Sequence, residues 1–239
     1  MKSLPLMMAG LLLSSTLFAA AWDYDTHGPG SWATLSPEYK LCSDGQNQSP
    51  LNLTNMTHTE ISAPSMAYHS STGQVVDNGH AIQWTPDEKM NLVFKNQTYT
   101  LLQTHFHTPS EHTLNGVSFP AEAHLVHQND TGDLLVIGVF FKSGYSNAFI
   151  DNMLMDLQNQ KTSPLHPAGL LPRDKSIINY SGSLTTPPCS EGVTWVVMQT
   201  PATMSPSQLA ELTSKHDGNA RPTQAINARM ILKEQARSR

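Results

Sequence analysis

Three histidines in the middle of the chain have a spacing that suits metal binding. His105 and His107 lie two residues apart in the run TYTLLQTHFHT, and His124 lies in a second run, AEAHLVHQ, that also has the composition of a β-strand. Because residues two apart on a strand share a face, two neighbouring strands could bring the three imidazoles to one point. Three nitrogen ligands with an open fourth position are typical of catalytic zinc sites, whereas structural sites are closed by protein ligands. The sequence therefore predicts a catalytic zinc centre.

Two polar side chains stand in register with these histidines. Gln103 precedes His105 by two residues, and Glu122 precedes His124 by two, so each pair shares a strand face. A zinc-bound imidazole commonly donates its second ring N–H to such a partner, which fixes the orientation of the ring. A lone histidine would more often be an ordinary buried or surface residue, but three histidines with two partners favour a metal site.

The composition bounds the class of protein. A chain of 239 residues that is 38% hydrophobic and 14% charged fits one globular domain with a sizeable core. The net charge of −5, with no basic cluster, argues against a nucleic-acid-binding protein. Sixteen prolines and fourteen glycines indicate many turns and short strands rather than long helices.

The N-terminal residues 1–21 have the layout of a cleaved secretory signal peptide: one lysine, an apolar run and three alanines. The alternative, an uncleaved membrane anchor, is disfavoured because Ser and Thr interrupt a run that is barely long enough to span a bilayer. We therefore expect residues 22–239 to form a single periplasmic or secreted domain with no membrane span. In that compartment Cys42 and Cys189 most simply pair with each other, and two buried free thiols are the alternative.

Strands dominate the expected secondary structure. Residues 74–86 alternate in polarity, so that Val76, Asn78, His80, Ile82 and Trp84 are expected on one strand face. A hairpin is expected to turn near Asn96 before the long strand that carries His105 and His107. Further strands are expected over 121–128, 133–142, 176–188, 193–201 and 225–232, with a turn at 129–132.

Two helices are expected at the surface. The first covers about residues 147–158, and the second begins after Ser205 with a Pro206–Gln208 capping box and stops near Gly218. Residues 22–53 are rich in Gly, Pro, Asn and Asp and are expected to be irregular. Together these patterns predict a mainly β (α+β) single domain, built on a large, mostly antiparallel central β-sheet with short peripheral helices.

Four motifs together resemble those of the α-class carbonic anhydrases, in particular the exported bacterial members: NGHA, QTHFHTPSEHT, AEAHLVHQ and SGSLTTPP, in this order. The resemblance extends from about Trp22 to the C-terminus. It implies a Zn²⁺ cofactor and the reversible hydration of carbon dioxide to bicarbonate and a proton, by zinc-hydroxide attack on CO2 with a histidine proton shuttle. The implied partners are the small molecules CO2 and bicarbonate, and a homodimer is left open.

The resemblance also implies a role for each matching residue of the metal site. It makes His105, His107 and His124 the zinc ligands, and Gln103 and Glu122 the partners of His105 and His124. By the same match, the carbonyl side of Asn219 becomes the partner of His107. His112 and His127 are expected in buried hydrogen-bond networks that support the site.

The remaining implied roles concern the reaction and its loop. Thr185 resembles the threonine that accepts a hydrogen bond from zinc-bound hydroxide, and Glu191 the carboxylate that receives that threonine's proton in a hydrogen bond. Thr186 is implied to contact bicarbonate, and His80 to be the proton shuttle. The cysteine pair matches a disulfide of exported members. The apolar wall for CO2 is implied at Val126, Val136, Leu184, Val193 and Trp195.

Two other functions remain compatible with three histidines alone. One is a catalytically silent zinc-binding module that holds or buffers the metal. The other is a zinc hydrolase acting on esters or peptides, although the chain has no HExxH motif. The residues that distinguish an enzyme from the first of these alternatives are Thr185, Glu191 and His80, because a protein that only holds metal would not need them.

Overall fold

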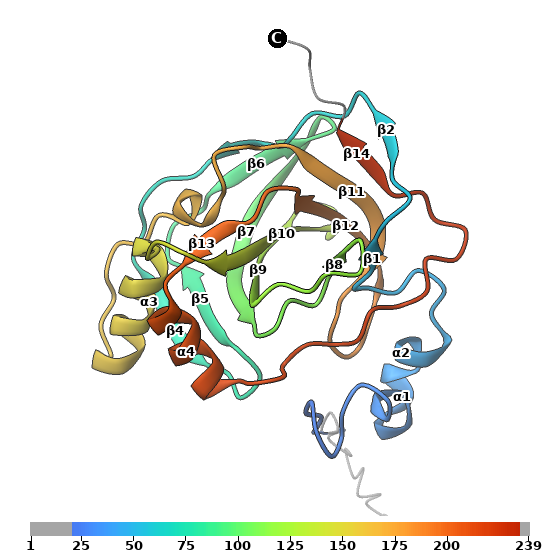
Figure 1. Ribbon diagram of the computed structural model, residues 1–239, viewed down its shortest axis with the longest axis horizontal. Coiled ribbons are helices and arrows are strands. Elements are labelled where there is room, and N and C mark those ends of the chain that lie inside the picture. The colour runs from blue at the N-terminus through green and yellow to red at the C-terminus, as the bar shows by residue number, and fades with distance from the viewer. Residues whose placement is uncertain (1–20, 235–239) are drawn as a thin grey trace, which may run out of the picture.

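The computed structural model describes residues 21–234 and is dominated by one large curled sheet (Figure 1). The predicted signal peptide, residues 1–21, lies outside the described residues apart from Ala21. Within 21–234, no helix is both long and apolar enough to cross a membrane. The strands are β1 (Asn52–Leu53), β2 (Thr57–Thr59), β3 (Ser65–Ala67), β4 (Gly73–Asp77), β5 (Ile82–Pro86), β6 (Asn91–Phe94), β7 (Gln97–His107), β8 (Thr113–Leu114), β9 (Ala121–Gln128), β10 (Leu134–Ser143), β11 (Ile177–Ser183), β12 (Glu191–Met198), β13 (Ala202–Met204) and β14 (Leu232–Glu234).

Twelve of these strands form the central sheet, whose main path runs β2-β14-β11-β12-β10-β9-β7-β5-β4. Most neighbours run antiparallel, while β10 lies parallel to β12 and β13, and β14 lies parallel to β2. The short strands β1 and β8 pair separately. The prediction of a mainly β fold on a large, mostly antiparallel sheet is confirmed.

The helices lie at the edges of the sheet (Figure 1). The α-helices are α1 (Trp32–Leu35), α2 (Leu41–Asp44), α3 (Ala148–Asn159) and α4 (Pro206–Lys215), and the 3-10 turns are η1 (Pro37–Tyr39) and η2 (Pro167–Leu170). Helix α3 is capped by the Asn147 side chain, and α4 begins with the predicted capping box of Ser205 and Gln208. Gln208 Nε2 also donates to Asp151 Oδ1 at 2.6 Å, which joins the two helices.

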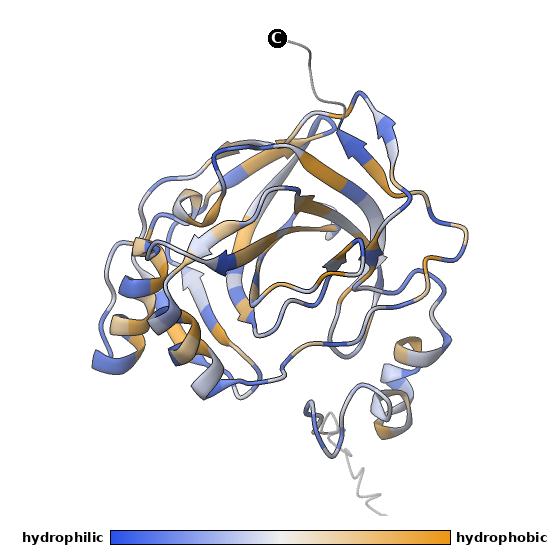
Figure 2. Ribbon diagram, in the orientation of Figure 1, coloured by the Kyte–Doolittle hydropathy of each residue, from blue (hydrophilic) through white to orange (hydrophobic). Residues whose placement is uncertain are grey.

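Apolar side chains cover both faces of the middle of the sheet. On β10, Leu135 and Ile137 face one buried cluster, while Val136 and Phe140 face the other. Both β9 and β10 are buried on both faces, but only β10 is a nearly continuous apolar run, whereas β9 carries the buried polar residues Glu122, His124 and His127. In Figure 2, hydrophobic colouring is prominent on β10 and β12, while helices α3 and α4 carry both hydrophobic and hydrophilic residues. The strands β7 and β9, which carry the three predicted ligand histidines, lie within this double-sided core.

The structure corrects two predictions of local structure. Residues 74–86 do not form one strand, because β4 and β5 pair as a hairpin around residues 78–81. The Asn78 side-chain oxygen accepts from the backbone N–H groups of His80 and Ala81, and Gly79 has φ +85°, so a tight turn replaces the alternation. His80 therefore lies in a turn rather than on a shared strand face.

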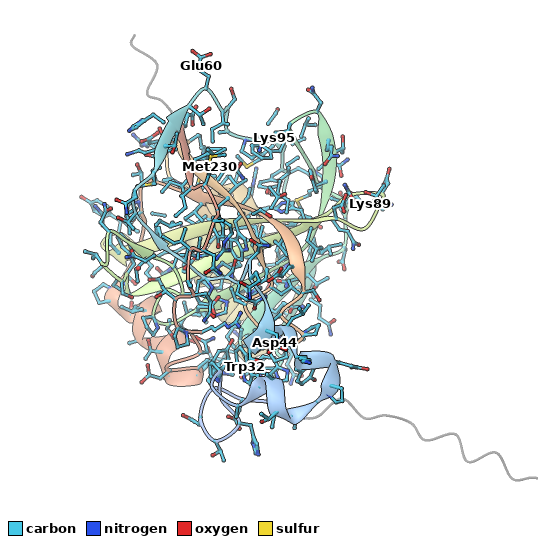
Figure 3. All side chains as sticks on the ribbon, turned by 90° about the vertical axis from the view of Figure 1, so that its right-hand side faces the viewer. Trp32, Asp44, Glu60, Lys89, Lys95 and Met230 are labelled. Carbon is cyan, nitrogen blue, oxygen red and sulfur yellow. A yellow bond between two sulfur atoms is a disulfide. The ribbon has the colours of Figure 1, made fainter. Side chains whose placement is uncertain are left out.

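The second correction concerns residues 22–53, which were expected to be irregular. Short helices α1, α2 and η1 form there because the segment packs its aromatic residues around the cysteine bridge, with Trp32 fully buried. In the view of Figure 3, Trp32 and Asp44 of this segment lie at the opposite end of the molecule from Lys95 and Met230. The predicted hairpin near Asn96 is confirmed, since Lys95 and Asn96 both have φ above zero between β6 and β7.

His127 on β9 is completely buried between two hydrogen-bonding partners. The Tyr68 hydroxyl lies 2.7 Å from its Nε2, and the Leu135 carbonyl lies 3.3 Å from its Nδ1. Burial lowers the pKa of His127 from its ordinary value of 6.5 to about 4. The folded protein therefore keeps this ring neutral in mildly acidic solution.

We expect the buried His127 to lower the free energy of unfolding by about 3 kcal/mol as the pH falls from about 6.5 to about 4, because a pKa unit is worth about 1.4 kcal/mol. In that window the unfolded chain binds a proton at this ring and the folded chain does not, and below it both are protonated. Urea unfolding of the parent and of His127→Gln at several pH values measures the difference. Equal pH slopes for the two proteins would contradict the prediction.

Candidate active site

The antiparallel pairing of β7 and β9 brings the three predicted ligands together. The register sets His105 directly opposite His124 and His107 opposite Glu122. The candidate ligand atoms of His105, His107 and His124 all lie within 4.8 Å of one another. His107 and His124 are buried, while His105 is partly exposed toward a cavity. The period of two along each strand thus places the imidazoles at one point, as the sequence predicted.

Each imidazole is held by a different hydrogen-bond partner. His105 Nδ1 lies 2.8 Å from Gln103 Oε1, and His124 Nε2 lies 2.9 Å from Glu122 Oε1. His107 Nδ1 donates to the main-chain carbonyl of Asn219 at 2.6 Å. These contacts leave Nε2 of His105, Nε2 of His107 and Nδ1 of His124 free to face a common metal, with ring orientations fixed by the partners.

Two buried polar atoms at this point lack a hydrogen-bond partner among the described residues. They are Nε2 of His107 and Oε2 of Glu111, which lie 3.4 Å from each other. A buried polar atom without a partner is costly, and a metal ion would satisfy the imidazole nitrogen. Imidazole is a preferred zinc ligand, so the donor set fits zinc.

The electrostatics of the cluster favour a bound cation. Burial lowers the pKa of His105 and of His107 below the ordinary value, which keeps these rings in the neutral form that binds metal. Burial would also lower the pKa of His124, but the carboxylates of Glu122 and Glu111 raise it above the ordinary value. The negative charges of these two carboxylates would equally stabilise a cation bound beside the His124 ring.

Glu122 is itself held by a buried network. Burial would raise its pKa, but the neighbouring His112 and His124 hold it well below the usual range. His112 Nδ1 lies 2.7 Å from Glu122 Oε1, and its Nε2 lies 2.6 Å from the Tyr180 hydroxyl. His112 therefore lies in the kind of supporting network expected for it.

An open cavity of about 150 Å³ lies beside the histidine cluster. It brings His80 and Thr186 to the same space as His105 and His107, although these residues are far apart in the sequence. The lining residues are Trp22, Tyr24, Asn78, His80, Ala81, Gln83, Gln103, His105, His107 and Thr186. The cavity is large enough for a small substrate and a few water molecules.

His80 lines this cavity and stacks on Trp22. The two ring centroids are 3.7 Å apart and the planes differ by 7°. Burial lowers the pKa of His80, the nearby His216 lowers it further, and Asp23 opposes the shift. An imidazole that titrates below its ordinary value releases a bound proton readily to solvent.

The predicted apolar residues form one cluster that reaches the metal site. Val126, Val136, Val193 and Trp195 are buried in it, and Leu184 packs against it partly exposed. The Trp195 ring lies 4.8 Å from the His124 ring, measured between centroids. The apolar cluster therefore extends up to the ring of a candidate zinc ligand, His124.

The loop that carries Thr185 and Thr186 is tied down by the two cysteines. Cys42 and Cys189 form a disulfide, with their Cα atoms 5.1 Å apart, so the predicted pairing is confirmed. Cys189 N donates to the Thr186 carbonyl at 2.8 Å, which closes the loop on itself. Thr185 is buried within it.

Glu191 does not lie where its predicted role requires. Its carboxylate accepts hydrogen bonds from Asn47 N at 2.6 Å and from Gln48 Nε2 at 3.1 Å, and no hydrogen bond joins it to Thr185 within residues 21–234. The bulge between β11 and β12 carries Glu191 toward the N-terminal segment instead. Its carboxylate braces the loop, and the predicted contact with Thr185 is not found.

The carboxylate that faces the histidine cluster is Glu111, which the sequence reasoning missed. Its Oε2 lies 3.4 Å from His107 Nε2 and 3.8 Å from His124 Nδ1, and its Oε1 accepts from Arg221 N at 2.9 Å. The side chain is fully buried. Its position four residues after His107, within the quoted motif SEHT, was the signal that could have identified it.

Comparisons with known proteins agree on one family. A family model described as eukaryotic-type carbonic anhydrase matches residues 27–235. A carbonic anhydrase of Pectobacterium carotovorum is 37% identical over 238 residues, which cover 96% of this chain and 98% of that protein. A carbonic anhydrase of Neisseria gonorrhoeae is 38% identical over 246 residues, with coverages of 97% and 98%. The solved α-carbonic anhydrase of Thermovibrio ammonificans, in complex with the inhibitor sulfanilamide, matches with a TM-score of 0.85 at 39% identity, covering 90% of this chain and 99% of that one.

Proposed function

Because this chain belongs to the carbonic anhydrase family and is an enzyme of that kind, we propose that it interconverts carbon dioxide and bicarbonate at a zinc ion held by His105, His107 and His124. The observation that carries the proposal is the convergence of three oriented imidazoles beside a cavity that His80 also lines. A silent metal-holding module would need the ligands but not the cavity with its proton acceptor.

The metal supplies one element of the chemistry. Zinc with three protein ligands lowers the pKa of a bound water to about 7, so that a hydroxide nucleophile exists at neutral pH, and carbonic anhydrases are the standard example. Gln103, Glu122 and the Asn219 carbonyl orient the three rings for this purpose. They also raise the basicity of the rings as ligands.

Thr185 is proposed to orient the attacking oxygen, with Glu111 in place of Glu191 as the acceptor of its proton. A hydroxyl has one proton, so a threonine that donates to a carboxylate can only accept from the oxygen on its other side. Glu111 supports this role because its Oε2 is buried, faces the ligands and lacks a partner among the described residues. Glu191 already accepts from Asn47 and Gln48.

The substrate and the product proton are proposed to use different parts of the site. Carbon dioxide is apolar, and the buried cluster of Val126, Val136 and Trp195, with its neighbours, offers a matching wall. Thr186 lines the cavity and can donate to bicarbonate. His80 accepts the proton that is released in each turnover and passes it to buffer.

We expect Glu111→Gln to lower kcat/KM for CO2 hydration about ten- to a hundredfold, and Glu191→Gln to lower it much less. A positioned acid or base contributes at least about a hundredfold to the rate of a catalysed reaction. The loss is expected to be smaller here, because the carbonyl oxygen of glutamine can still accept a hydrogen bond. Stopped-flow hydration rates on both variants, with zinc content verified, provide the measurement. A larger loss for Glu191→Gln would restore the original assignment.

The proposed activity itself is tested by stopped-flow CO2 hydration on the mature protein, with and without a zinc chelator. The expected result is a rate well above that of buffer, which the chelator removes and added zinc restores. A zinc-loaded protein that hydrates CO2 no faster than buffer would overturn the proposed activity and favour a protein that only holds metal. Ester hydrolysis measured beside it shows whether that reaction is a side activity.

Export to the periplasm or the exterior is proposed on the disulfide and on the composition of residues 1–21. A bridge between Cys42 and Cys189 persists in oxidising compartments and is rare in the cytosol. Fractionation of cells that express the full chain, with N-terminal sequencing of the product, tests both the location and the cleavage.

A further inference from the structure

The turn that carries His80 is held by a hydrogen-bonded pair, Asp77 and His216, whose second member comes from a distant part of the chain. Asp77 ends β4, and its Oδ1 accepts from Gly79 N at 3.0 Å and from His216 Nε2 at 2.7 Å. His216 is the residue that follows the last turn of α4. The same carboxylate oxygen thus joins the backbone of the turn to the end of a helix 139 residues away.

A second connection runs through Asn219. Its Nδ2 donates to the His80 carbonyl at 2.9 Å, while its own main-chain carbonyl accepts from His107 Nδ1. Thr108 Oγ1 donates to the His216 carbonyl at 2.5 Å, and its N–H donates to Asn219 Oδ1. Residues 216–219 therefore contact both the turn that carries His80 and the strand that carries His107.

The charged groups near the Asp77–His216 pair affect the pKa of Asp77 in the opposite direction to its burial. Burial would raise the pKa of Asp77, but hydrogen bonds from Gly79 and His216, and the charges of His216 and Lys215, lower it. Asp156 and Lys161 of the helix side line a groove with Asp77. The side chain of His216 is 16% exposed, against 42% for Asp77, so the histidine end of the contact is the better shielded from solvent.

Other groups face His80 itself. Its ring stacks on Trp22, and Asp23 on the same segment acts on it with a negative charge. His216 acts on it with the opposite sign when protonated. The cavity side presents the candidate ligands His105 and His107. Among these residues, His216 is the one that hydrogen-bonds Asp77, the residue that anchors the turn of His80.

We propose that the pair of His216 and Asp77 positions the turn that carries His80 and thereby sets how fast a proton leaves the active site. The proposal rests on the proposed function, in which His80 receives that proton and passes it to buffer. His216 is a positioning residue here, since its contacts are with Asp77 and Thr108 and not with substrate or metal.

The proposal separates two steps of the reaction. Loss of the pair loosens the turn that carries His80, so the transfer of the proton to buffer changes. The step that joins CO2 to oxygen takes place beside His107 and Thr185 and does not involve the pair. Proton release follows the joining of CO2 to oxygen, so a change confined to proton release is expected to alter kcat and to leave kcat/KM unchanged.

Two variants test the pair, and a third serves as a matched control. His216→Gln replaces the imidazole but keeps a side-chain donor, and Asp77→Asn keeps the shape of the acceptor but removes its negative charge. His69 and Glu88 form a similar contact at 3.1 Å on the surface, with no contact to the His80 turn, so His69→Gln is the control. At low buffer concentration kcat is expected to fall about two- to fivefold in the first two variants, the factor that a partly exposed ion pair is worth, and to recover with added imidazole.

A second measurement does not depend on activity. Hydrogen exchange of the backbone amides of Gly79 and His80 in metal-free protein is expected to be faster by a similar factor in both variants and unchanged in His69→Gln. Unchanged exchange and unchanged kcat would overturn the proposal, as would an equal fall in kcat and kcat/KM. If the parent itself shows no hydration, the proposed function fails, whereas the exchange rates still decide whether the pair holds the turn.

Discussion

Replacing His107 with alanine is expected to weaken zinc binding by more than about a hundredfold and to reduce CO2 hydration to the rate of buffer. The reason for this lower bound is that even the hydrogen-bond partners of metal ligands are worth about ten- to a hundredfold in affinity. His107 is a direct candidate ligand, and its Nε2 is a buried atom without another partner among the described residues. Its loss leaves two imidazoles, which do not make the three-ligand site of a catalytic zinc.

The measurement is a competition titration with a zinc chelator of known affinity, followed by stopped-flow rates at saturating zinc. Gln103→Ala provides a graded comparison, because it removes only the acceptor of His105 Nδ1 at 2.8 Å, and about a tenfold loss is expected. Circular dichroism of the metal-free variants shows whether the fold is retained. Zinc affinity and activity close to those of the parent in a folded His107→Ala protein would exclude the proposed ligand set.

Removal of the disulfide is expected to lower the free energy of unfolding by about 4–5 kcal/mol, the chain-entropy value for a closed loop of this length. Cys42 and Cys189 are separated by 147 residues, so the bridge removes a large amount of freedom from the unfolded chain. Both residues are buried with Trp32 and Tyr39 in a small cluster of their own. That cluster attaches the N-terminal segment to the loop of Thr185.

At temperatures well below the unfolding transition, removal of the disulfide is expected to leave most of the hydration activity in place, even though it lowers the free energy of unfolding. Gln48 Nε2 still donates to the Cys189 carbonyl at 3.0 Å, and Arg221 Nη2 to the Cys42 carbonyl at 2.8 Å, so the loop keeps other supports. Urea unfolding and hydration rates of the Cys42→Ala/Cys189→Ala double variant, and of the parent after verified reduction, measure the two effects. An unchanged melting temperature and rate after reduction would contradict the stabilising role of the bridge.

Local periodicity explains what could be predicted of the fold and the site. The spacing of His105, His107 and His124 on two strands depends only on the period of two and on the pairing of β7 with β9, and both are encoded in short stretches. The capping box of α4 and the Asn96 turn are local in the same sense. These features follow from the chemistry of adjacent residues, so the sequence was sufficient for them.

Contacts between segments far apart in the sequence could not be predicted from it. Asx-turn chemistry at Asn78 places His80 in a turn, and only the folded chain shows that Trp22 stacks on it and His216 holds its anchor. The resemblance pointed to Glu191 alone, but Glu191 accepts hydrogen bonds from Asn47 and Gln48, and it is Glu111 that faces the candidate ligands.

The sequence by itself determined the class of fold, the three candidate ligands with two of their partners, and, through resemblance, the family. Only the tertiary structure decided which carboxylate faces the ligands, and that His80 is anchored from the end of α4. The physical reason is range. Strand periodicity and capping act over a few residues, whereas the curl of a twelve-stranded sheet sets which side chains more than a hundred residues apart come into contact.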